Sequence, residues 1–211
     1  MKGRRIPSAH FAFNFRSQQV KGKQNGRRVT SPMLTLVLGG ARSGKSRFAQ
    51  SLCAPGRRVI FIATACLDDD EMRARVAHHQ QARPAHWHTV EEPLAIGHIV
   101  ETRAVDFDFV LLDCLTLWLS NLCWEHRDRS EEVLRAAASQ EVARLIAASS
   151  ASNVVVVSNE VGYGLVPESP VGRAFRDLQG WLNQELACAA TYVYQVVAGI
   201  PIPIKRPEGK V

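Results

Sequence analysis

The sequence predicts a single α/β domain built on a mainly parallel, doubly wound sheet. From residue 34 onward, short apolar runs rich in β-branched residues alternate with longer segments whose apolar residues step by three and four. The first pattern is typical of buried parallel strands, and the second is typical of amphipathic helices. A glycine-rich segment directly follows the first run, an order found where a sheet binds phosphate groups at the carboxyl ends of its strands.

The apolar run Leu34–Leu38 leads into GGARSGKS, which fits the phosphate-binding pattern GxxxxGK[ST] without a mismatch. In such a P-loop the backbone N–H groups surround a polyphosphate, and the following helix points its positive end at the anion. We therefore expect a P-loop NTPase-like fold in which Lys45 reaches the outer phosphates and the Ser46 hydroxyl binds Mg²⁺. The expected phosphate-binding residues are Gly39, Gly40, Ala41, Arg42, Ser43, Gly44, Lys45 and Ser46.

Two further apolar runs, Arg58–Thr64 and Phe107–Leu115, predict buried strands. The second carries Asp113, 67 residues after Ser46, in the position of a carboxylate that holds Mg²⁺ opposite the P-loop hydroxyl. An aspartate at the end of a strand is common, so Asp113 indicates a metal site only in combination with the P-loop. The carboxyl end of the first strand, Thr64–Cys66, is expected to open beside the P-loop, where ligands bind in open α/β sheets.

A helix is predicted from about Asp69 to Ala82, where Pro84 ends it. His79 lies on the apolar face of this helix, with Met72 and Val76, and is interpreted as a structural histidine. His78 lies one residue round the helix, where it is freer to reach a nucleotide, and a neutral imidazole can attack an activated phosphorus near pH 7. From spacing alone, a surface histidine remains the competing interpretation of His78.

His86 and His88 flank a tryptophan, but no third ligand follows at a recognisable metal-binding spacing, which favours structural roles. Glu91 and Glu92 precede Pro93 and predict the start of another helix, which runs to about Thr102. Either carboxylate could instead bind a ribose or a base.

The second half of the chain continues the alternation. The run Leu115–Trp124 is expected to pack as a helix or to form a subunit contact. Beyond it, the periodicity predicts helices from Ser130 to about Ser149 and from Val171 to Ala189, a central strand of four valines at Val154–Val157, a strand at Tyr192–Val197, and an extended tail, Gly199–Lys205, whose prolines allow only an edge strand.

The net charge of +6 arises from the amino-terminal segment. Residues 1–32 hold eight of the 26 Lys and Arg and none of the 20 acidic residues, so residues 33–211 hold 18 basic against 20 acidic residues, a net charge of −2. We expect residues 1–32 to be a disordered basic extension and residues 33–211 to form the folded domain. Met33 stands directly before the first strand, so a mis-annotated start codon is an equally good explanation of the extension.

Composition excludes several other classes of protein. No apolar run approaches the roughly 20 residues that span a bilayer, so no membrane insertion is expected. The five cysteines are odd in number and form no CxxC pair, which argues against a disulfide framework or a zinc site and fits the reducing cytoplasm. Residues 33–211 have a net charge of −2, so they lack the basic composition of a nucleic-acid-binding domain.

Four motifs in order carry a specific resemblance: GGARSGKS, IATACLDDDEMRARVAHHQQARPAHW, LLDCLTLWLSN and VSNEVGYGLVPESPVGRAFRDLQGWLNQELA. Across about residues 33–205 the chain resembles the bifunctional adenosylcobinamide kinase / adenosylcobinamide-phosphate guanylyltransferase family of cobalamin biosynthesis. The resemblance implies phosphorylation of adenosylcobinamide by ATP or GTP, followed by transfer of GMP from GTP to that phosphate through a covalent guanylyl-histidine. It also implies a homotrimer with sites near the subunit boundaries.

The resemblance assigns the GMP-carrying histidine to His78, against the surface interpretation. It places the GTP contacts on Gly39–Ser46, Thr64–Cys66 (Thr64, Ala65 and Cys66), Glu91 and Asp113, and on His79, Gln80, Gln81 and Ala82. The last group has little of the charge seen in relatives, so its contacts are expected to come mostly from the backbone. Guanylyl transfer further requires that the helix carrying His78 sit over the nucleotide or swing toward it.

The sequence alone leaves two competing functions open. One is a single-function P-loop kinase of a small metabolite, in which His78 is a surface residue. The other is a nucleotide-regulated nucleic-acid binder that uses the basic extension.

Overall fold

The computed structural model describes residues 23–24, 27–28, 32–53, 55–66 and 83–207. The chain divides into two compact units, residues 1–31 and residues 32–211. In the first unit, β1 (Lys23–Gln24) pairs antiparallel with β2 (Arg27–Arg28). The second unit contains the P-loop.

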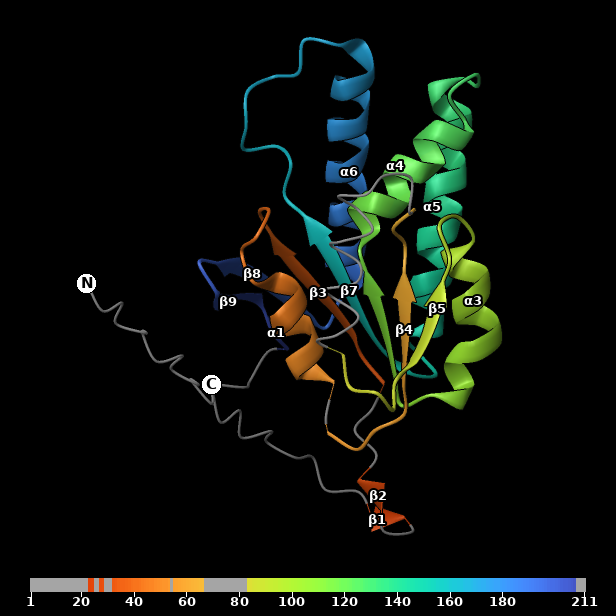
Figure 1. The fold of residues 1–211 in the computed structure, drawn as a ribbon, viewed down its shortest axis with the longest axis vertical. Coiled ribbons are helices and arrows are strands. Elements are labelled where there is room, and N and C mark those ends of the chain that lie inside the picture. Colours follow the sequence, from red (N-terminus) through yellow and green to blue (C-terminus); the bar gives the residue numbers. More distant parts are fainter. Residues whose placement is uncertain (1–22, 25–26, 29–31, 54, 67–82, 208–211) are drawn as a thin grey trace, which may run out of the picture. The chain divides into compact units, whose positions relative to one another are not determined.

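Seven strands of the second unit form one sheet, in the order β5-β4-β6-β7-β3-β8-β9 (Figure 1). All neighbouring pairs are parallel except β8 and β9, which form an antiparallel hairpin at one edge. The strands are β3 (Leu34–Gly39), β4 (Val59–Ala63), β5 (His88–Glu91), β6 (Phe109–Asp113), β7 (Asn153–Asn159), β8 (Tyr192–Val197) and β9 (Ile200–Lys205).

Helices cover both faces of this sheet, which confirms the predicted doubly wound, P-loop NTPase-like architecture. On one face, α1 packs against Val37, Phe61, Leu111 and Val157. The other face packs against α3, α4, α5 and α6 (Figure 1). The helices are α1 (Lys45–Leu52), α3 (Ile96–Arg103), α4 (Leu115–Glu125), α5 (Glu131–Ala148) and α6 (Pro170–Ala189), and a short 3₁₀ turn, η1 (Ala104–Asp106), follows α3.

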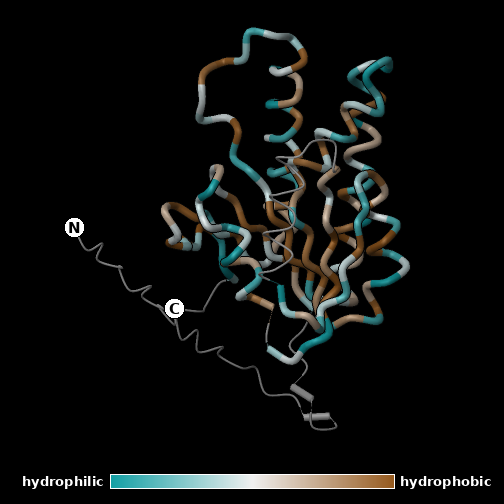
Figure 2. Tube along the Cα trace, in the orientation of Figure 1, coloured by the Kyte–Doolittle hydropathy of each residue, from teal (hydrophilic) through white to brown (hydrophobic). Residues whose placement is uncertain are grey.

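The central strands are buried on both faces because each carries consecutive apolar residues. All six residues of β3 and all five of β4 are buried, and in β7 the four valines are at most 2% exposed. Figure 2 shows the hydrophobic strands enclosed by helices whose outer faces are hydrophilic. The prediction of a central valine strand is confirmed, since β7 lies between β6 and β3.

The structure corrects the expectation for residues 88–102. His88–Glu91 forms an edge strand, β5, and the helix begins only at Ile96. Glu92 does mark the start of that helix, because its Oε1 accepts hydrogen bonds from the N–H groups of Leu94 (2.9 Å) and Ala95 (2.8 Å). The helix predicted from Val171 to Ala189 is present as α6, but Val171 at its amino end is 74% exposed.

The predicted edge position of the carboxyl-terminal tail is confirmed, since β9 is the last strand of the sheet among the described residues and pairs with β8. Within the part of the chain that the structure describes, no helix is long and apolar enough to cross a membrane.

Candidate active site

The P-loop connects the carboxyl end of β3 to the first turn of α1. The Ser43 N–H donates to the Gly40 carbonyl at 3.3 Å, and Arg42 takes a positive φ of 56° to complete this turn. Gly44 (φ 93°) precedes the helix, which begins at Lys45. No side chain caps the amino end of α1. The first N–H groups of α1 are therefore available to an anion.

Gly39 is required by close packing as well as by its positive φ of 159°. A Cβ at this position would lie 2.6 Å from Ser43 Oγ and 2.7 Å from the carbonyl oxygen of Val196 in β8. The loop is also held from the sheet edge, because the N–H of Gly199 donates to the Ser43 carbonyl at 2.7 Å. The turn of the β8–β9 hairpin thus braces the P-loop.

Lys45 extends back over the P-loop, where its Nζ donates to the Gly40 carbonyl at 3.1 Å. Burial lowers the pKa of the Lys45 ammonium, and the nearby Cys114 and Asp113 side chains act in the opposite direction. A partly desolvated cation gains more from an anionic partner than a hydrated one. The arrangement suits an ammonium that binds phosphate.

Asp113 and Glu91 reach the same edge of the sheet as the P-loop. In the strand register, Ala63 of β4 lies between Asp113 of β6 on one side and Glu91 of β5 on the other. Residues in register on neighbouring strands share a face of the sheet, so Asp113, Ala63 and Glu91 point to the same side. Phe61, two positions before Ala63, is on this side too and packs in the same cluster as α1. Asp113 is therefore on the same side of the sheet as Lys45, as expected for a carboxylate near the P-loop.

Thr64 is placed differently from the expectation that residues 64–66 open beside the P-loop. Two strands, β6 and β7, separate β4 from β3. The Thr64 hydroxyl is fully buried and bonded to the main chain of Cys114, while Asn121 Nδ2 donates to the Thr64 carbonyl at 2.7 Å. Thr64 thus organises the strand ends, and the half-buried Ala65 and Cys66 extend beyond it.

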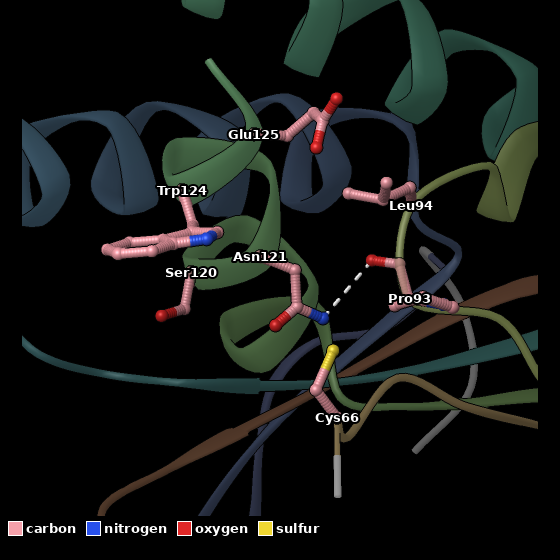
Figure 3. A pocket seen from close by; sticks show the side chains of 7 residues that line it. All are labelled: Cys66, Pro93, Leu94, Ser120, Asn121, Trp124 and Glu125. Atoms are coloured by element: carbon pink, nitrogen blue, oxygen red, sulfur yellow. Dashed lines mark hydrogen bonds between the residues drawn. The ribbon is translucent and has the colours of Figure 1, made fainter. Parts of the chain in front are cut away.

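A pocket of about 430 Å³ lies between α4 and the ends of β4 and β5. Figure 3 shows Asn121 and Glu125 of α4 on the side of Cys66, Pro93 and Leu94, whereas Ser120 and Trp124 extend from the opposite side of the helix. Asn121 also donates to the Pro93 carbonyl at 3.2 Å, so one side chain joins both loops at the pocket floor. The indole of Trp124 is 71% exposed and offers a flat surface at the rim.

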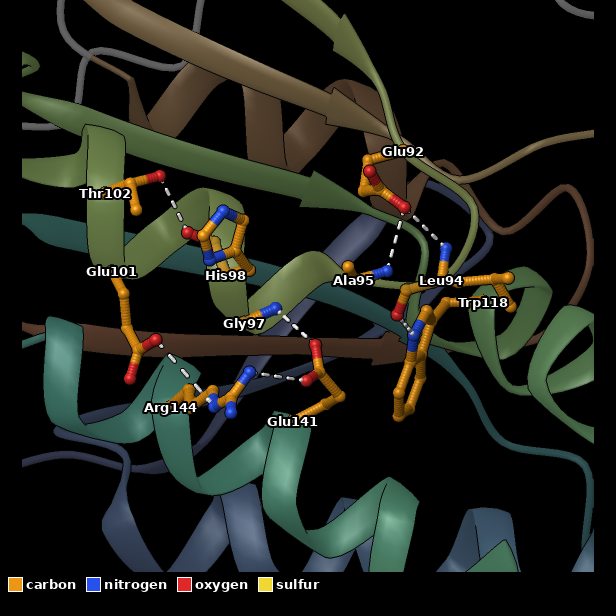
Figure 4. A network of polar contacts seen from close by, with 10 residues as sticks. All are labelled: Glu92, Leu94, Ala95, Gly97, His98, Glu101, Thr102, Trp118, Glu141 and Arg144. Carbon is orange, nitrogen blue, oxygen red and sulfur yellow. Dashed lines mark hydrogen bonds and ion pairs between the residues drawn. The ribbon is translucent and has the colours of Figure 1, made fainter.

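The walls of this pocket are fixed by hydrogen bonds from neighbouring helices (Figure 4). The buried Trp118 of α4 donates from Nε1 to the Leu94 carbonyl at 2.7 Å. Glu141 of α5 accepts from the N–H of Gly97 at 2.7 Å and pairs with Arg144 at 3.1 Å. Helices α3, α4 and α5 are thereby joined beneath the β5–α3 loop.

A second buried network holds the carboxyl end of β7. Ser158 Oγ donates to Asn183 Oδ1 of α6 at 2.7 Å, and Gln179 Nε2 donates to both residues at 3.0 and 3.1 Å. Asn183 Nδ2 in turn donates to the Asn159 carbonyl at 3.2 Å and to Glu160 Oε1 at 3.3 Å. These bonds position Asn159 beside Gly39, its partner in the register.

Some buried polar atoms have no hydrogen-bond partner. Six such side-chain atoms occur in the described part of the chain, and four of them belong to Ser43 of the P-loop, Asn159 at the end of β7, and Arg83, which lies over Phe61 of β4. Leaving such an atom unpaired costs about 1–3 kcal/mol, so each is a position where a polar ligand could complete the structure. Arg83 lies within the second of the four motifs, but nothing in the sequence assigned it a role.

Several predicted site residues lie outside the described part of the chain: His78, His79, Gln80, Gln81 and Ala82. Of the histidines that follow them, His88 has structural contacts. His88 Nε2 lies 3.2 Å from Arg103 Nη2, and its ring stacks on Phe107 at 5.7 Å. Among the described residues, no group of three His, Cys, Asp or Glu side chains could hold a metal ion, and no cysteine forms a disulfide.

Known proteins resemble this chain over most of its length. A family model described as cobinamide kinase / cobinamide phosphate guanyltransferase matches residues 35–204. The bifunctional adenosylcobalamin biosynthesis protein CobU of Escherichia coli (strain K12) is 44% identical over 181 residues, which are 82% of this chain and 100% of the relative. The corresponding protein CobP of Pseudomonas aeruginosa is 43% identical over 178 residues, 82% of this chain and 98% of the relative.

A solved structure of the RadB recombinase matches with a TM-score of 0.42 and 16% identity, over 78% of this chain and 74% of that chain.

Proposed function

The chain belongs to the cobinamide kinase / cobinamide phosphate guanyltransferase family, and from that premise we propose how its P-loop edge serves two reactions. The enzyme phosphorylates adenosylcobinamide with ATP or GTP and then transfers GMP from GTP to adenosylcobinamide phosphate, in adenosylcobalamin biosynthesis. The observation that carries the assignment is the P-loop of residues 39–46 within a chain that spans its bifunctional relatives from end to end.

In the kinase reaction, the P-loop amides and Lys45 bind the phosphates of the nucleotide. The partly desolvated Lys45 ammonium stabilises negative charge on the γ-phosphate as it moves to the substrate hydroxyl. Ser46 and Asp113 offer the hydroxyl and carboxylate oxygens that Mg²⁺ prefers, from the first turn of α1 and the end of β6. When bound there, Mg²⁺ would neutralise charge on the phosphate oxygens.

In the guanylyl transfer, His78 is the nucleophile. Its neutral imidazole nitrogen attacks the α-phosphorus of GTP, a P–N bond forms, and the bond to the bridging oxygen breaks to release pyrophosphate. An oxygen of adenosylcobinamide phosphate then displaces the histidine and gives adenosylcobinamide-GDP. Support for this role comes from the HH pair in this chain and from the bifunctional names of its relatives.

The active form is a homotrimer located in the cytoplasm. Large apolar side chains are exposed on the loop before α6, where Leu165 is 97%, Tyr163 84% and Val166 65% exposed. An exposed group of this kind marks a protein contact in many soluble proteins. Cysteines that form no disulfide in the described part of the chain fit a reducing compartment. Light scattering during size-exclusion chromatography should give three times the chain mass of 23.3 kDa.

The decisive experiment uses GTP labelled at the α-phosphorus. The protein is incubated with Mg²⁺ and this GTP, denatured and mapped by peptide. Label should stay on the peptide that contains His78, survive alkali and be released by acid. His78→Ala should abolish it, whereas the matched control His86→Ala, an exposed histidine nearby, should retain it.

The alternative, a single-function P-loop small-metabolite kinase, predicts GTP binding without any covalent label. That result in the wild-type protein would refute the role of His78.

A further inference from the structure

The guanidinium of Arg83 occupies an unusual position on the α1 face of the sheet. Its central carbon lies 3.6 Å from the centroid of the Phe61 ring, and Trp87 stacks on the same ring at 6.5 Å. The Nε and Nη1 atoms of Arg83 are buried and have no hydrogen-bond partner. The aromatic surface holds the guanidinium carbon in place but uses none of these donors, which lie in the guanidinium plane.

Arg83 is close to both carboxylates at the strand ends. Burial lowers the pKa of Arg83, while Asp113 and then Glu91 act to raise it. The register explains this proximity, because Phe61 lies two positions before Ala63, and Ala63 lies between Asp113 and Glu91 on adjacent strands. Asp113 also acts on Lys45. The carboxylate of Asp113 is therefore near two cations, Lys45 at the P-loop and Arg83 over β4.

A purely structural role accounts for only part of this arrangement. If Arg83 existed to neutralise the two carboxylates, its donors would be expected to be saturated by them. Instead, two buried donor positions, Nε and Nη1, remain unpaired, which is unfavourable unless a ligand pairs with them. The planar fork of an arginine matches phosphate oxygens in pairs, and a phosphate would satisfy these donors.

We propose that Arg83 is a phosphate-binding residue of this active site, the second cation after Lys45. The inference rests on the proposed function for the source of the phosphate, which is either GTP or the phosphate of adenosylcobinamide phosphate. Both present the same anionic oxygens to the guanidinium. In either case Arg83 donates hydrogen bonds to non-bridging oxygens and takes no part in proton transfer.

The test compares Arg83→Met with Arg58→Met. Methionine keeps an apolar stem over Phe61 and removes the charge and the donors. Arg58 lies at the opposite end of β4, where its guanidinium pairs with Asp108 at 3.7 Å and its side chain is 57% exposed, so it controls for the loss of one arginine. Arg83→Gln is made in parallel, and it is compared with Arg58→Met in the same way if Arg83→Met does not fold.

The first measurement is GTP binding by calorimetry, which needs no turnover. If the phosphate of GTP is the ligand, Arg83→Met should weaken GTP binding about 10- to 100-fold, the loss expected for one charge-assisted contact. If the acceptor phosphate is the ligand, GTP binding should be unchanged and the KM for adenosylcobinamide phosphate should rise by a similar factor. Arg83→Lys should recover part of either loss, because it restores charge without the planar fork.

The inference is overturned if Arg83→Met or Arg83→Gln matches Arg58→Met in both GTP affinity and KM. Failure of the proposed function would look different. In that case wild-type protein would take no label from GTP, while the effect of Arg83 on GTP affinity could still be measured.

Discussion

The hydroxyl of Thr64 and the main chain of Cys114 form two hydrogen bonds that join the ends of β4 and β6. Thr64 Oγ1 donates to the Cys114 carbonyl at 2.8 Å and accepts from the Cys114 N–H at 3.0 Å. Both residues are buried, so water does not offer these backbone groups alternative partners. Cys114 directly follows Asp113, and the pair of bonds therefore fixes the strand end that carries this carboxylate.

Replacement of Thr64 by valine should destabilise the protein by about 1–3 kcal/mol, because it leaves the N–H of Cys114 unpaired in the interior, whereas the Cys114 carbonyl keeps its hydrogen bond from the Trp118 N–H at 3.2 Å. Thr64→Ser keeps both bonds and loses one methyl group, so it should cost only about 1 kcal/mol. Urea unfolding followed by circular dichroism measures both variants. Equal losses for valine and serine would show that packing of the methyl group, rather than hydrogen bonding, matters here.

Gly39→Ala should destabilise the protein by about 1–3 kcal/mol, the usual cost of overpacking. The added Cβ would meet a backbone carbonyl, that of Val196, at 2.7 Å, and a carbonyl in a paired strand cannot rotate away. Gly40→Ala is the matched control, since a Cβ there meets nothing within 4 Å, and its stability should stay within about 0.5 kcal/mol of wild type. Thermal unfolding distinguishes them, and a similar shift for both would contradict the packing argument.

Asn183→Ala should lower both stability and nucleotide affinity. The change removes the acceptor of Ser158 and Gln179 and the donor to the Asn159 carbonyl, so several buried groups lose partners at about 1–3 kcal/mol each. The end of β7 beside Gly39 would then be less well positioned. Gln184→Ala changes the next, exposed residue of α6 and should alter neither property. A loss of stability without any change in GTP affinity would separate this network from the site.

Sequence patterns predicted the elements whose signals are local. Residues 34–39 and 109–113 are strands because consecutive apolar residues are buried on both faces, and the P-loop is recognised by its own eight residues. Strand β5 was missed because HTVE is short and mostly exposed, and it becomes a strand through pairing with β4.

The missed parts of the site depend on contacts between distant residues. Arg83 meets Phe61 across 22 positions, and Gly199 braces the P-loop from the end of the chain. Neither contact leaves a periodic pattern in the sequence. Both follow from the strand order, which places β4 beside β5 and β8 beside β3.

Two buried thiols predict a pH dependence of stability. Burial raises the pKa of Cys53 to about 12 and that of Cys114 to about 11, from an ordinary value of 9.0. Above pH 9 the unfolded chain releases these protons while the folded chain keeps them, so the unfolded state binds fewer protons and stability falls as pH rises. Below pH 9 the thiols contribute no slope.

The slope should reach about 1.4 kcal/mol per pH unit for each thiol. Cys53→Ala should therefore show a flatter decline between pH 9 and 11 than wild type, whereas Cys188→Ala, at an exposed position, should not. Urea midpoints across this range provide the measurement. Parallel curves for wild type and Cys53→Ala would mean that the Cys53 thiol ionises in the folded state as readily as in the unfolded one.

Deletion of the basic extension should leave the enzyme intact. Residues 32–211 form a compact unit, and its first strand is anchored by the Met33 carbonyl, which accepts from the Val154 N–H at 2.8 Å. A chain that begins at Met33 keeps this bond and should match the full chain in unfolding temperature and GTP affinity. A chain that begins at Leu36 loses the bond and the buried Leu34, and should be less stable by at least about 2 kcal/mol.

The same deletion tests the remaining competing function, because it changes the net charge from +6 to −2. If residues 1–32 bound nucleic acid, the full chain would bind RNA or DNA with an affinity that falls steeply with salt, and the chain that begins at Met33 would not. We expect neither chain to show such binding. Loss of GTP affinity on deletion to Met33 would instead assign the extension to the active site, since the strand that carries the P-loop is complete in both chains.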